Sequence, residues 1–417
     1  MFIENLLTTA TAHLTERYLT LQEYSSPSLP AKPDRTSSYL LYIHIPFCQE
    51  LCPYCSFVRI EFEKTLAGRY FDALRKEIQM YSNMGYVFDS IYIGGGTPTI
   101  DIDELAKTVS LAKTLWPIKR ISVETNPNHL VPEKLGILKE LGTTRLSVGV
   151  QSFNDEILEQ ISRLRKYGSG EEIKEKLSST VGIFDTVNAD MIFNFPNQND
   201  QRLLADIETI KAIKTDQVTY YPLMISKVRK ENITQSCGKI SFKREKRLYR
   251  MVVAELTEMY NQETIWCFAK SKGRLDEYII DHDEYAGVGA GSFGYINGMR
   301  IFNTFSVQRY ADMIQSGLCP VVGTRKLHTA ERARFYFLMK LFTGSMNIAD
   351  AKAVFGNRFW LYLCGEMAFL VASGSATFRD GNITLTHRGR YYWMVMMRTL
   401  FSVLGDVREK YMAGGVF

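Results

Sequence analysis

The fold is decided by YLLYIHIPFCQELCPYC, residues 39–55, which joins a buried-strand pattern to a group of cysteines. The first seven residues are apolar apart from His44, and this predicts a strand that is buried on both faces. The following residues place Cys48, Cys52 and Cys55 in a CxxxCxxC spacing. A strand that leads into a loop of metal-ligand residue types is typical of α/β proteins, in which chemistry collects where parallel strands end.

The strand pattern returns along the next 180 residues or so and alternates with helical periodicity. The predicted strands are Tyr39–Ile45, Ser90–Ile93, Arg120–Glu124, Arg145–Val150, Thr186–Phe193 and Gln217–Tyr221. The predicted helices are Leu66–Met84, Asp103–Leu115, Pro132–Leu141, Asp155–Leu164, Gly170–Ser179 and Gln201–Ile213. Alternation of this kind predicts a parallel sheet, and right-handed crossovers wind such units into a barrel or part of one.

The pattern changes after Tyr221. A long helix is predicted at Phe242–Asn261, and a glycine-rich stretch follows at residues 286–299, AGVGAGSFGYINGM. Near the C-terminus we predict helices, a hairpin around Asp380-Gly381 and a last helix, which together indicate a winged-helix-like module. Their ranges are Thr329–Phe342, Arg358–Ala372, 376–386 and Arg390–Tyr411. The module lacks a basic recognition helix, so we interpret it as a lid or packing domain.

We therefore expect four segments. They are an N-terminal helix (3–24) and linker within residues 1–37, a barrel at 38–225, a barrel extension with the glycine-rich stretch at 226–325, and a helical, winged-helix-like domain at 326–417.

Composition narrows the function classes. Hydrophobic residues make up 46% of the 417 residues and charged residues 23%, which argues against a disordered or coiled-coil chain. The net charge of +5 is mild, and the basic run at residues 239–250 is predicted to be a solvated helix face, so we expect no nucleic-acid partner. No apolar run reaches the ~18–20 residues of a membrane span. The first 24 residues resemble neither a signal nor a transit peptide, so we expect a cytoplasmic protein.

The cysteines indicate a metal site in a reducing compartment. Seven is an odd number, and three cysteines lie within eight residues, which is unlike a disulfide framework. Three such thiolates can hold three irons of a [4Fe–4S] cube and leave the fourth iron open to a ligand. A zinc site is the alternative, but no fourth Cys or His lies at finger-like spacing. Outside the motif we interpret four cysteines as ordinary thiols: Cys237, Cys267, Cys319 and Cys364.

These motifs resemble the radical S-adenosylmethionine (SAM) superfamily. More narrowly, they resemble the oxygen-independent coproporphyrinogen III oxidase family, including HemW-type haem chaperones and anaerobic haem-degrading methyltransferases. The motifs are YIHIPFCxxxCxYC (42–55), GGGTPT (94–99), ETNP (124–127) and RLSVGVQSFND (145–155). The resemblance covers roughly residues 38–300. It implies a partial (β/α)6 radical SAM barrel with a C-terminal α+β, winged-helix-like accessory domain.

The resemblance also implies cofactors and a reaction. Cys48, Cys52 and Cys55 would hold a [4Fe–4S] cluster, and the open iron would bind SAM. An electron from a reductase or a flavodoxin- or ferredoxin-type donor would cleave SAM to a 5′-deoxyadenosyl radical, which abstracts hydrogen from substrate. The residues that match the family's SAM contacts are Tyr54, Gly95, Gly96, Thr97, Glu124, Gln151, Arg163 and Asp190.

Several of these residues also have ordinary structural interpretations. Glu124 is as well suited to bonding a helix N-terminus as to binding SAM. Tyr42 and His44 point to one face of their strand, beside the cysteines, and are candidate catalytic residues, although a histidine on an apolar strand is often part of the core. Gly289 and Gly291 could approach a second SAM closely, or could form a tight turn packed on the barrel edge.

Two differences from the motifs of known family members indicate the branch of the family to which this sequence is most similar. The decarboxylating oxidases carry a further cysteine in a CGC run, whereas Cys55 is followed by Ser56-Phe57-Val58. HemW-type chaperones carry an HNxxYW motif, which is missing from residues 267–299; His282 is the nearest candidate haem ligand. The stretch 276–310 resembles most the haem-degrading and class C methyltransferase types.

Three hypotheses follow. The favoured one is a radical SAM enzyme that acts on a haem or porphyrin by radical methyl transfer, with ring opening as a further outcome. The second is an oxygen-independent coproporphyrinogen III oxidase, which decarboxylates propionates. The third is a haem delivery protein of the HemW type that does not turn over substrate.

Overall fold

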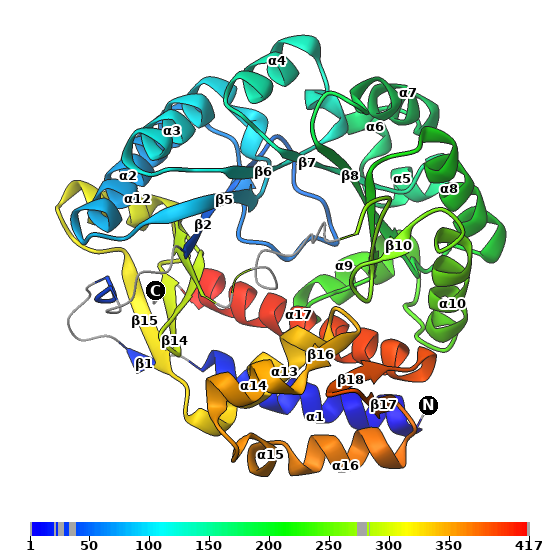
Figure 1. The fold of residues 1–417 in the computed structure, drawn as a ribbon. Helices are drawn as coiled ribbons and strands as arrows, with labels where there is room; N and C mark the ends of the chain where they lie inside the picture. The colour runs from blue at the N-terminus through cyan, green and yellow to red at the C-terminus, as the bar shows by residue number, and fades with distance from the viewer. Residues whose placement is uncertain are drawn as a thin grey trace.

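The computed structural model describes residues 2–20, 22–23, 29–32, 39–272, 282 and 284–414. Much of the linker predicted at residues 25–38 therefore lies outside the described residues. The predicted alternation is confirmed as six parallel strands, with helices around the outside (Figure 1). The strands are β2 (Tyr39–Ile45), β5 (Phe88–Gly95), β6 (Arg120–Thr125), β7 (Arg145–Gln151), β8 (Thr186–Phe193) and β9 (Gln217–Pro222).

The helices between these strands also follow the prediction, with one correction. They are α2 (Lys64–Asn83), α3 (Ile102–Leu115), α4 (Pro132–Glu140), α7 (Gly170–Thr180) and α8 (Asp200–Ile213). The helix predicted at Asp155–Leu164 is instead two short helices, α5 (Asp155–Gln160) and α6 (Leu164–Tyr167). Ser162, between them, has φ of 57°, a left-handed conformation that interrupts a helix.

Helix α2 shows how the sequence specifies these elements. Glu63 caps its N-terminus by accepting hydrogen bonds from the backbone N–H groups of Thr65 and Leu66. Its buried residues include Phe71, Leu74 and Ile78, which recur at helical spacing. Strand β2 is buried at all seven positions, as expected for a strand between two parallel neighbours.

The glycine-rich stretch, expected as a barrel extension, forms strands that the sequence analysis did not predict. Strand β12 (Tyr285–Val288) pairs in parallel with β2, and β13 (Phe293–Ile296), β14 (Met299–Asn303) and β15 (Val321–Lys326) add antiparallel strands. At the other edge, β11 (Cys267–Ala269) and β10 (Asn261–Gln262) pair antiparallel beyond β9. Among the described residues, one 13-stranded sheet therefore runs from β1 (Gln22–Glu23) to β10. Helix α12 (Val307–Gln315) follows β14.

The C-terminal segment combines helices with a small sheet, as predicted. Its elements are α13 (Thr329–Leu341), β16 (Ser345–Asn347), α14 (Ile348–Phe355), α15 (Phe359–Tyr362), α16 (Cys364–Ala372), β17 (Ala376–Arg379), β18 (Asn382–Leu385) and α17 (His387–Gly414). The hairpin is confirmed: β17 pairs with β18, and Asp380 and Gly381 at its turn both have positive φ. The segment predicted as one helix at Arg358–Ala372 forms two helices, because the helical conformation is interrupted at Leu363.

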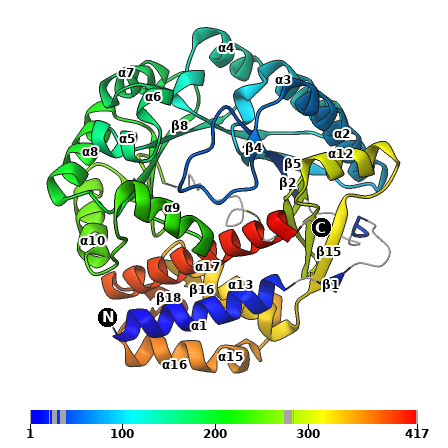
Figure 2. The same cartoon turned by 180° about the vertical axis from the view of Figure 1, so that it is seen from behind.

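Two helices are shorter than predicted by several residues, and the last helix, α17, is longer than the predicted Arg390–Tyr411. The helix predicted at Phe242–Asn261 is observed as the shorter helix α10 (Glu245–Leu256). Another helix, α9 (Lys227–Cys237), precedes it in the chain. The N-terminal helix α1 (Phe2–Leu19) ends earlier than predicted and packs along α17 (Figures 1 and 2). The first and last helices of the chain thus lie side by side across the barrel. Among the described residues, no helix is long and apolar enough to cross a membrane.

Candidate functional site

A cavity of about 340 Å³ lies where the barrel strands end, beneath the C-terminal helices. The parallel register brings the strand ends together: Ile45 lies opposite Gly95, and Gly149 lies opposite Asp190. Side chains from β2, β5, β6, β7, β8 and β9 form one wall, and α1, β13, β14, α13 and α17 supply the other. Of the predicted site residues, twelve line it: Tyr42, Cys48, Cys52, Tyr54, Cys55, Gly95, Gly96, Thr97, Glu124, Gln151, Arg163 and Asp190.

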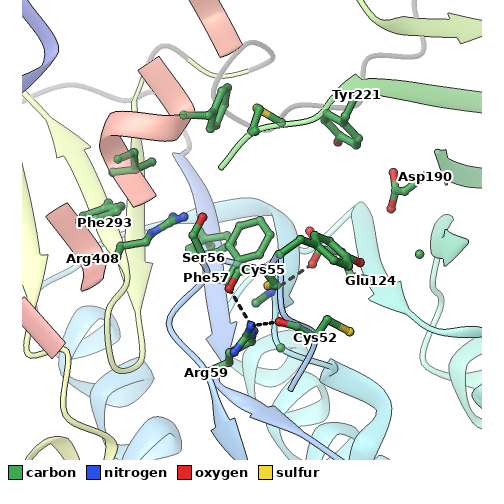
Figure 3. Close-up of a pocket in the computed structure, with 18 of the residues that line it drawn as sticks. Cys52, Cys55, Ser56, Phe57, Arg59, Glu124, Asp190, Tyr221, Phe293 and Arg408 are labelled. Carbon is green, nitrogen blue, oxygen red and sulfur yellow. Dashed lines mark hydrogen bonds between the residues drawn. The ribbon is translucent and has the colours of Figure 1, made fainter. Parts of the chain in front are cut away.

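The cysteine loop is held by an arginine that the sequence analysis did not single out. Arg59 donates to the carbonyl oxygens of Cys52, at 2.5 Å, and Cys55, at 2.6 Å (Figure 3). Cys48 lies in β3 (Phe47–Cys48), which pairs with β4 (Ile60–Glu61). The loop is therefore fixed at both ends, and its three thiols border the cavity.

Positive side chains surround the cysteine sulfurs. Arg163 and Lys166 each place a nitrogen 3.9 Å from the Cys52 sulfur. Thr97 donates to the Cys48 sulfur at 3.8 Å. The Nε atoms of Arg59 and Arg163 are shielded from solvent and have no hydrogen-bond partner among the described residues. Buried donors without partners, beside three thiols, suit an anionic group at this position.

The glycines of the GGGTPT turn are required by close packing. A Cβ on Gly94 would lie 2.8 Å from Glu124, and one on Gly96 would lie 2.6 Å from the carbonyl oxygen of Phe47. Gly95 has φ of 122°, and a Cβ there would lie 2.7 Å from the His44 ring. The turn therefore lies directly against β2 and the carboxylate of Glu124.

Two carboxylates face the cavity from β6 and β8, the strands on either side of β7. Glu124 accepts from Tyr92 at 2.9 Å and from the backbone N–H of Gly95 at 3.1 Å. Burial, followed by the charge of Asp190, raises the pKa of Glu124 to about 7. Burial also raises the pKa of Asp190 to about 6, although Arg145 opposes this effect. The two groups bring negative charge to the wall opposite Arg408 (Figure 3).

Arg163 joins the predicted residue Tyr54 to two residues that were not predicted, Gly149 and Tyr167. Its guanidinium donates to the carbonyl oxygen of Gly149 and reaches the Tyr54 hydroxyl at 3.5 Å. It also lies 4.2 Å from the centre of the Tyr167 ring. Gln151 ends β7 with φ of 77°, a strained conformation for a residue other than glycine. Strain of this kind at a cavity is common at functional sites.

Three predicted residues lie outside the cavity lining. His44 is buried, and its ring nitrogens contact the Tyr42 hydroxyl at 2.9 Å and the Val58 carbonyl oxygen at 2.8 Å. Burial lowers the pKa of His44 to about 4, so the ring is neutral at physiological pH. His44 therefore holds Tyr42 and does not itself face the cavity.

Gly289 and Gly291 belong to the packed edge of the barrel. The backbone N–H of Gly289 donates to buried Glu77 at 2.8 Å, and that of Gly291 donates to the Thr304 carbonyl oxygen at 2.7 Å. A Cβ on Gly289 would lie 2.4 Å from the Tyr70 hydroxyl. This geometry corresponds to the tight-turn interpretation, and it brings neither glycine to the cavity.

The sequence analysis missed the far wall of the cavity. That wall is aromatic and basic, and its members include Tyr18, Tyr285, Phe293, Tyr295, Arg300, Phe302, Phe335, Phe401 and Arg408. The spacing by two of Phe293 and Tyr295 could have indicated a strand. Only the packing of α1 and α17 against the barrel could place Tyr18 and Arg408.

Comparison with known proteins agrees with this geometry. Residues 42–210 match the Radical SAM superfamily profile. The chain is 31% identical over 374 residues to the haem chaperone HemW of Bacillus subtilis (strain 168), covering 84% of this chain and 95% of that protein. The chain belongs to the HemN/HemW-like family of radical SAM proteins.

Two other relatives of this radical SAM protein are informative. Anaerobilin synthase of Escherichia coli O157:H7 is 28% identical, over 45% of this chain and 43% of that protein. The structure of the coproporphyrinogen III oxidase HemN from Escherichia coli matches with a TM-score of 0.74 at 20% identity, covering 94% of this chain and 93% of that one. The HemN match shows that the barrel and the C-terminal segment share one known fold.

Membership of the family implies a [4Fe–4S] cluster and SAM, and the residues present suit both. The thiol set is Cys48, Cys52 and Cys55, and thiolates are the ligands that hold iron–sulfur clusters. Among the described residues, no three His, Cys, Asp or Glu side chains converge closely enough to hold one ion. The irons of a cube each take their own cysteine, so its ligands need not converge on one point.

Proposed function

We propose that this protein is a radical SAM enzyme that acts on a haem or porphyrin, by radical methyl transfer with ring opening as a further outcome. The observation that carries the proposal is the single cavity that joins the cysteine loop to an aromatic wall containing arginines. A flat aromatic macrocycle with acidic side chains matches such a wall, because rings stack on rings and guanidinium groups bind carboxylates.

Residues in different parts of the cavity would have different roles. Cys48, Cys52 and Cys55 would hold the cluster, and SAM bound to it would supply the 5′-deoxyadenosyl radical when an electron arrives. Glu124 and Asp190 offer carboxylates to the amino or ribose groups of SAM. Residues of α1 and α17 line the cavity opposite the strand ends, where they would help to hold the reacting hydrogen of the substrate close to the radical.

The electron would come from a reductase or a flavodoxin- or ferredoxin-type protein in the cytoplasm. A second SAM would be needed for methyl transfer. Gly289 and Gly291 are packed against Glu77 and Thr304 and do not line the cavity, so a second SAM in the cavity would bind other residues.

A haem delivery role is the second candidate, and the similarity to HemW favours it. Among the described residues, no histidine lines the cavity, whereas a protein that carries haem as cargo commonly supplies an axial histidine. This feature supports an enzyme that acts on the ring.

The test is an anaerobic assay of the reconstituted protein with SAM, reductant and either haem or coproporphyrinogen III, followed by mass spectrometry. A substrate that gains a methyl mass while deoxyadenosine forms supports the proposal. Loss of CO2 from coproporphyrinogen III would establish the oxidase reaction instead. Haem that binds unchanged, with no substrate-dependent deoxyadenosine, would favour delivery.

A further inference from the structure

A row of side chains crosses the sheet extension on one face. The register places Tyr285 opposite Tyr295, Tyr295 opposite Arg300, and Arg300 opposite Arg325. Side chains that are directly opposite in antiparallel strands point to the same face and interact. The first three residues of the row line the cavity, and Arg325 lies beyond it.

Arg300 and Arg325 differ in whether a carboxylate neutralises their charge. Arg325 pairs with Glu331 at 2.9 Å. Among the described residues, no carboxylate pairs with Arg300; its guanidinium lies 4.7 Å from the centre of the Phe335 ring and 5.9 Å from that of Tyr18. Burial and the nearby Arg325 lower the pKa of Arg300, yet a guanidinium stays charged in proteins. An uncompensated positive charge therefore borders the cavity.

A second arginine approaches the same region from the last helix of the chain. The Arg408 guanidinium lies 5.1 Å from the centre of the Phe57 ring and 5.3 Å from that of Phe293. Burial raises the pKa of Tyr285 to about 12, and both Arg300 and Arg408 act to lower it. Tyr285 is thus within electrostatic reach of two guanidinium groups that come from β14 and α17.

Acidic and basic side chains occupy different parts of the cavity, with Arg163 and Lys166 beside the cysteine loop. Glu124 and Asp190 lie on the barrel wall, and Arg408 lies beside Phe293 on the opposite wall (Figure 3). The carboxylates match the cationic amino group of SAM. The arginines match an anion, and the rings beside them match a flat apolar body.

We propose that Arg300 and Arg408 form a carboxylate-binding subsite that selects an aromatic substrate by its acidic side chains. The inference rests on the proposed function for the identity of the aromatic body, a tetrapyrrole. A planar guanidinium binds a carboxylate through two parallel hydrogen bonds, which fixes the ring in one orientation toward the cysteine loop. Residues of the sheet extension and of the last helix therefore determine specificity.

The test compares protoporphyrin IX with its dimethyl ester, which has the same ring and no carboxylates. Binding is measured anaerobically on the cluster-loaded full chain with SAM present. We expect the wild type to bind the free acid roughly tenfold more tightly than the ester. Arg300→Gln and Arg408→Gln should each remove most of that difference and leave ester binding unchanged.

Arg325→Gln is the matched control, because Arg325 is the cross-strand neighbour of Arg300 but lies outside the cavity lining. It should retain the preference for the free acid. The proposal is overturned if Arg300→Gln weakens acid and ester equally, or if Arg325→Gln removes the preference to the same extent. Unfolding curves of each variant exclude a loss that comes from misfolding.

A second probe separates this subsite from the proposed function. Naphthalene-2,6-dicarboxylate carries two carboxylates on a small aromatic body. If neither porphyrin binds but this diacid binds in a manner that Arg300→Gln weakens, the subsite stands and the tetrapyrrole function fails. If the wild type binds neither porphyrin nor the diacid, both proposals fail.

Discussion

The backbone N–H of Gly95 donates to the carboxylate of Glu124 at 3.1 Å, across the ends of two neighbouring strands. This bond ties the glycine turn that follows β5 to the acid that ends β6. It leaves the turn no freedom to move away from β2, against which Gly95 and Gly96 are packed. This part of the site is therefore built by the barrel itself.

Gly95→Ala should destabilise the protein. The new Cβ would meet the His44 ring at 2.7 Å while the backbone stays at a positive φ, and the cost should be about 2 kcal/mol or more. Gly68→Ala is the control, since nothing lies within 4 Å of its Cβ and Gly68 is inside α2. That change should stabilise by roughly 0.5–1 kcal/mol. Urea unfolding measures both; equal effects would contradict this account of the turn.

Arg59→Lys should loosen the cysteine loop without unfolding the barrel. Lysine keeps the charge but cannot hold the Cys52 and Cys55 carbonyl oxygens with a rigid planar group. We expect the reconstituted variant to lose iron several-fold faster to a chelator than the wild type, while its circular dichroism is unchanged. An unchanged rate of iron loss would show that the clamp is not needed.

Glu77 should make stability depend on pH. Burial raises the pKa of Glu77 to about 7 from an ordinary value of 4.5, so the folded state binds the proton more strongly than the unfolded state. This stabilisation is complete below pH 4.5 and is lost as the pH rises through about 7. The Gln variant does not titrate, so wild type alone loses this stabilisation. The stability of Glu77→Gln relative to wild type should therefore increase from pH 5 to pH 8, by at most about 3 kcal/mol.

The control for this pH dependence is Glu63→Gln. Backbone hydrogen bonds from Leu66 and Thr65 lower the pKa of Glu63, so its carboxylate is ionised at both pH 5 and pH 8. Its difference from wild type should be the same at the two pH values. If the Glu77→Gln difference were also the same at both, the buried carboxyl would not titrate as described.

The barrel could be predicted because its signals are local. Strands β2 and β8 begin and end at the predicted residues. β2 is an apolar run interrupted by His44, and β8 has apolar residues at alternate positions from Val187 to Phe193. The glycine-rich stretch has no such run, and its strands exist because β12 pairs with β2, more than 200 residues earlier in the chain. Local periodicity carries no information about such a pairing.

In the candidate site, too, some residues could be predicted from local motifs and others depend on long-range packing. The residues at the ends of the barrel strands were predicted from their motifs, and twelve of them line one cavity. Tyr18 and Arg408 come from helices near the two ends of the chain, and both line the cavity because α1 packs along α17. His44 could not be separated from a core histidine until its two hydrogen bonds were seen.

The most direct test of the central claim is the iron content of the cysteine variants. Anaerobically reconstituted wild type should hold roughly four irons and show the brown absorbance of a [4Fe–4S] cluster. Cys48→Ala, Cys52→Ala and Cys55→Ala should each lose both, whereas Cys364→Ala, which changes an exposed thiol outside the cavity lining, should keep them. Any of the three variants that retained full iron and absorbance would contradict the cluster site, and with it the proposed radical chemistry.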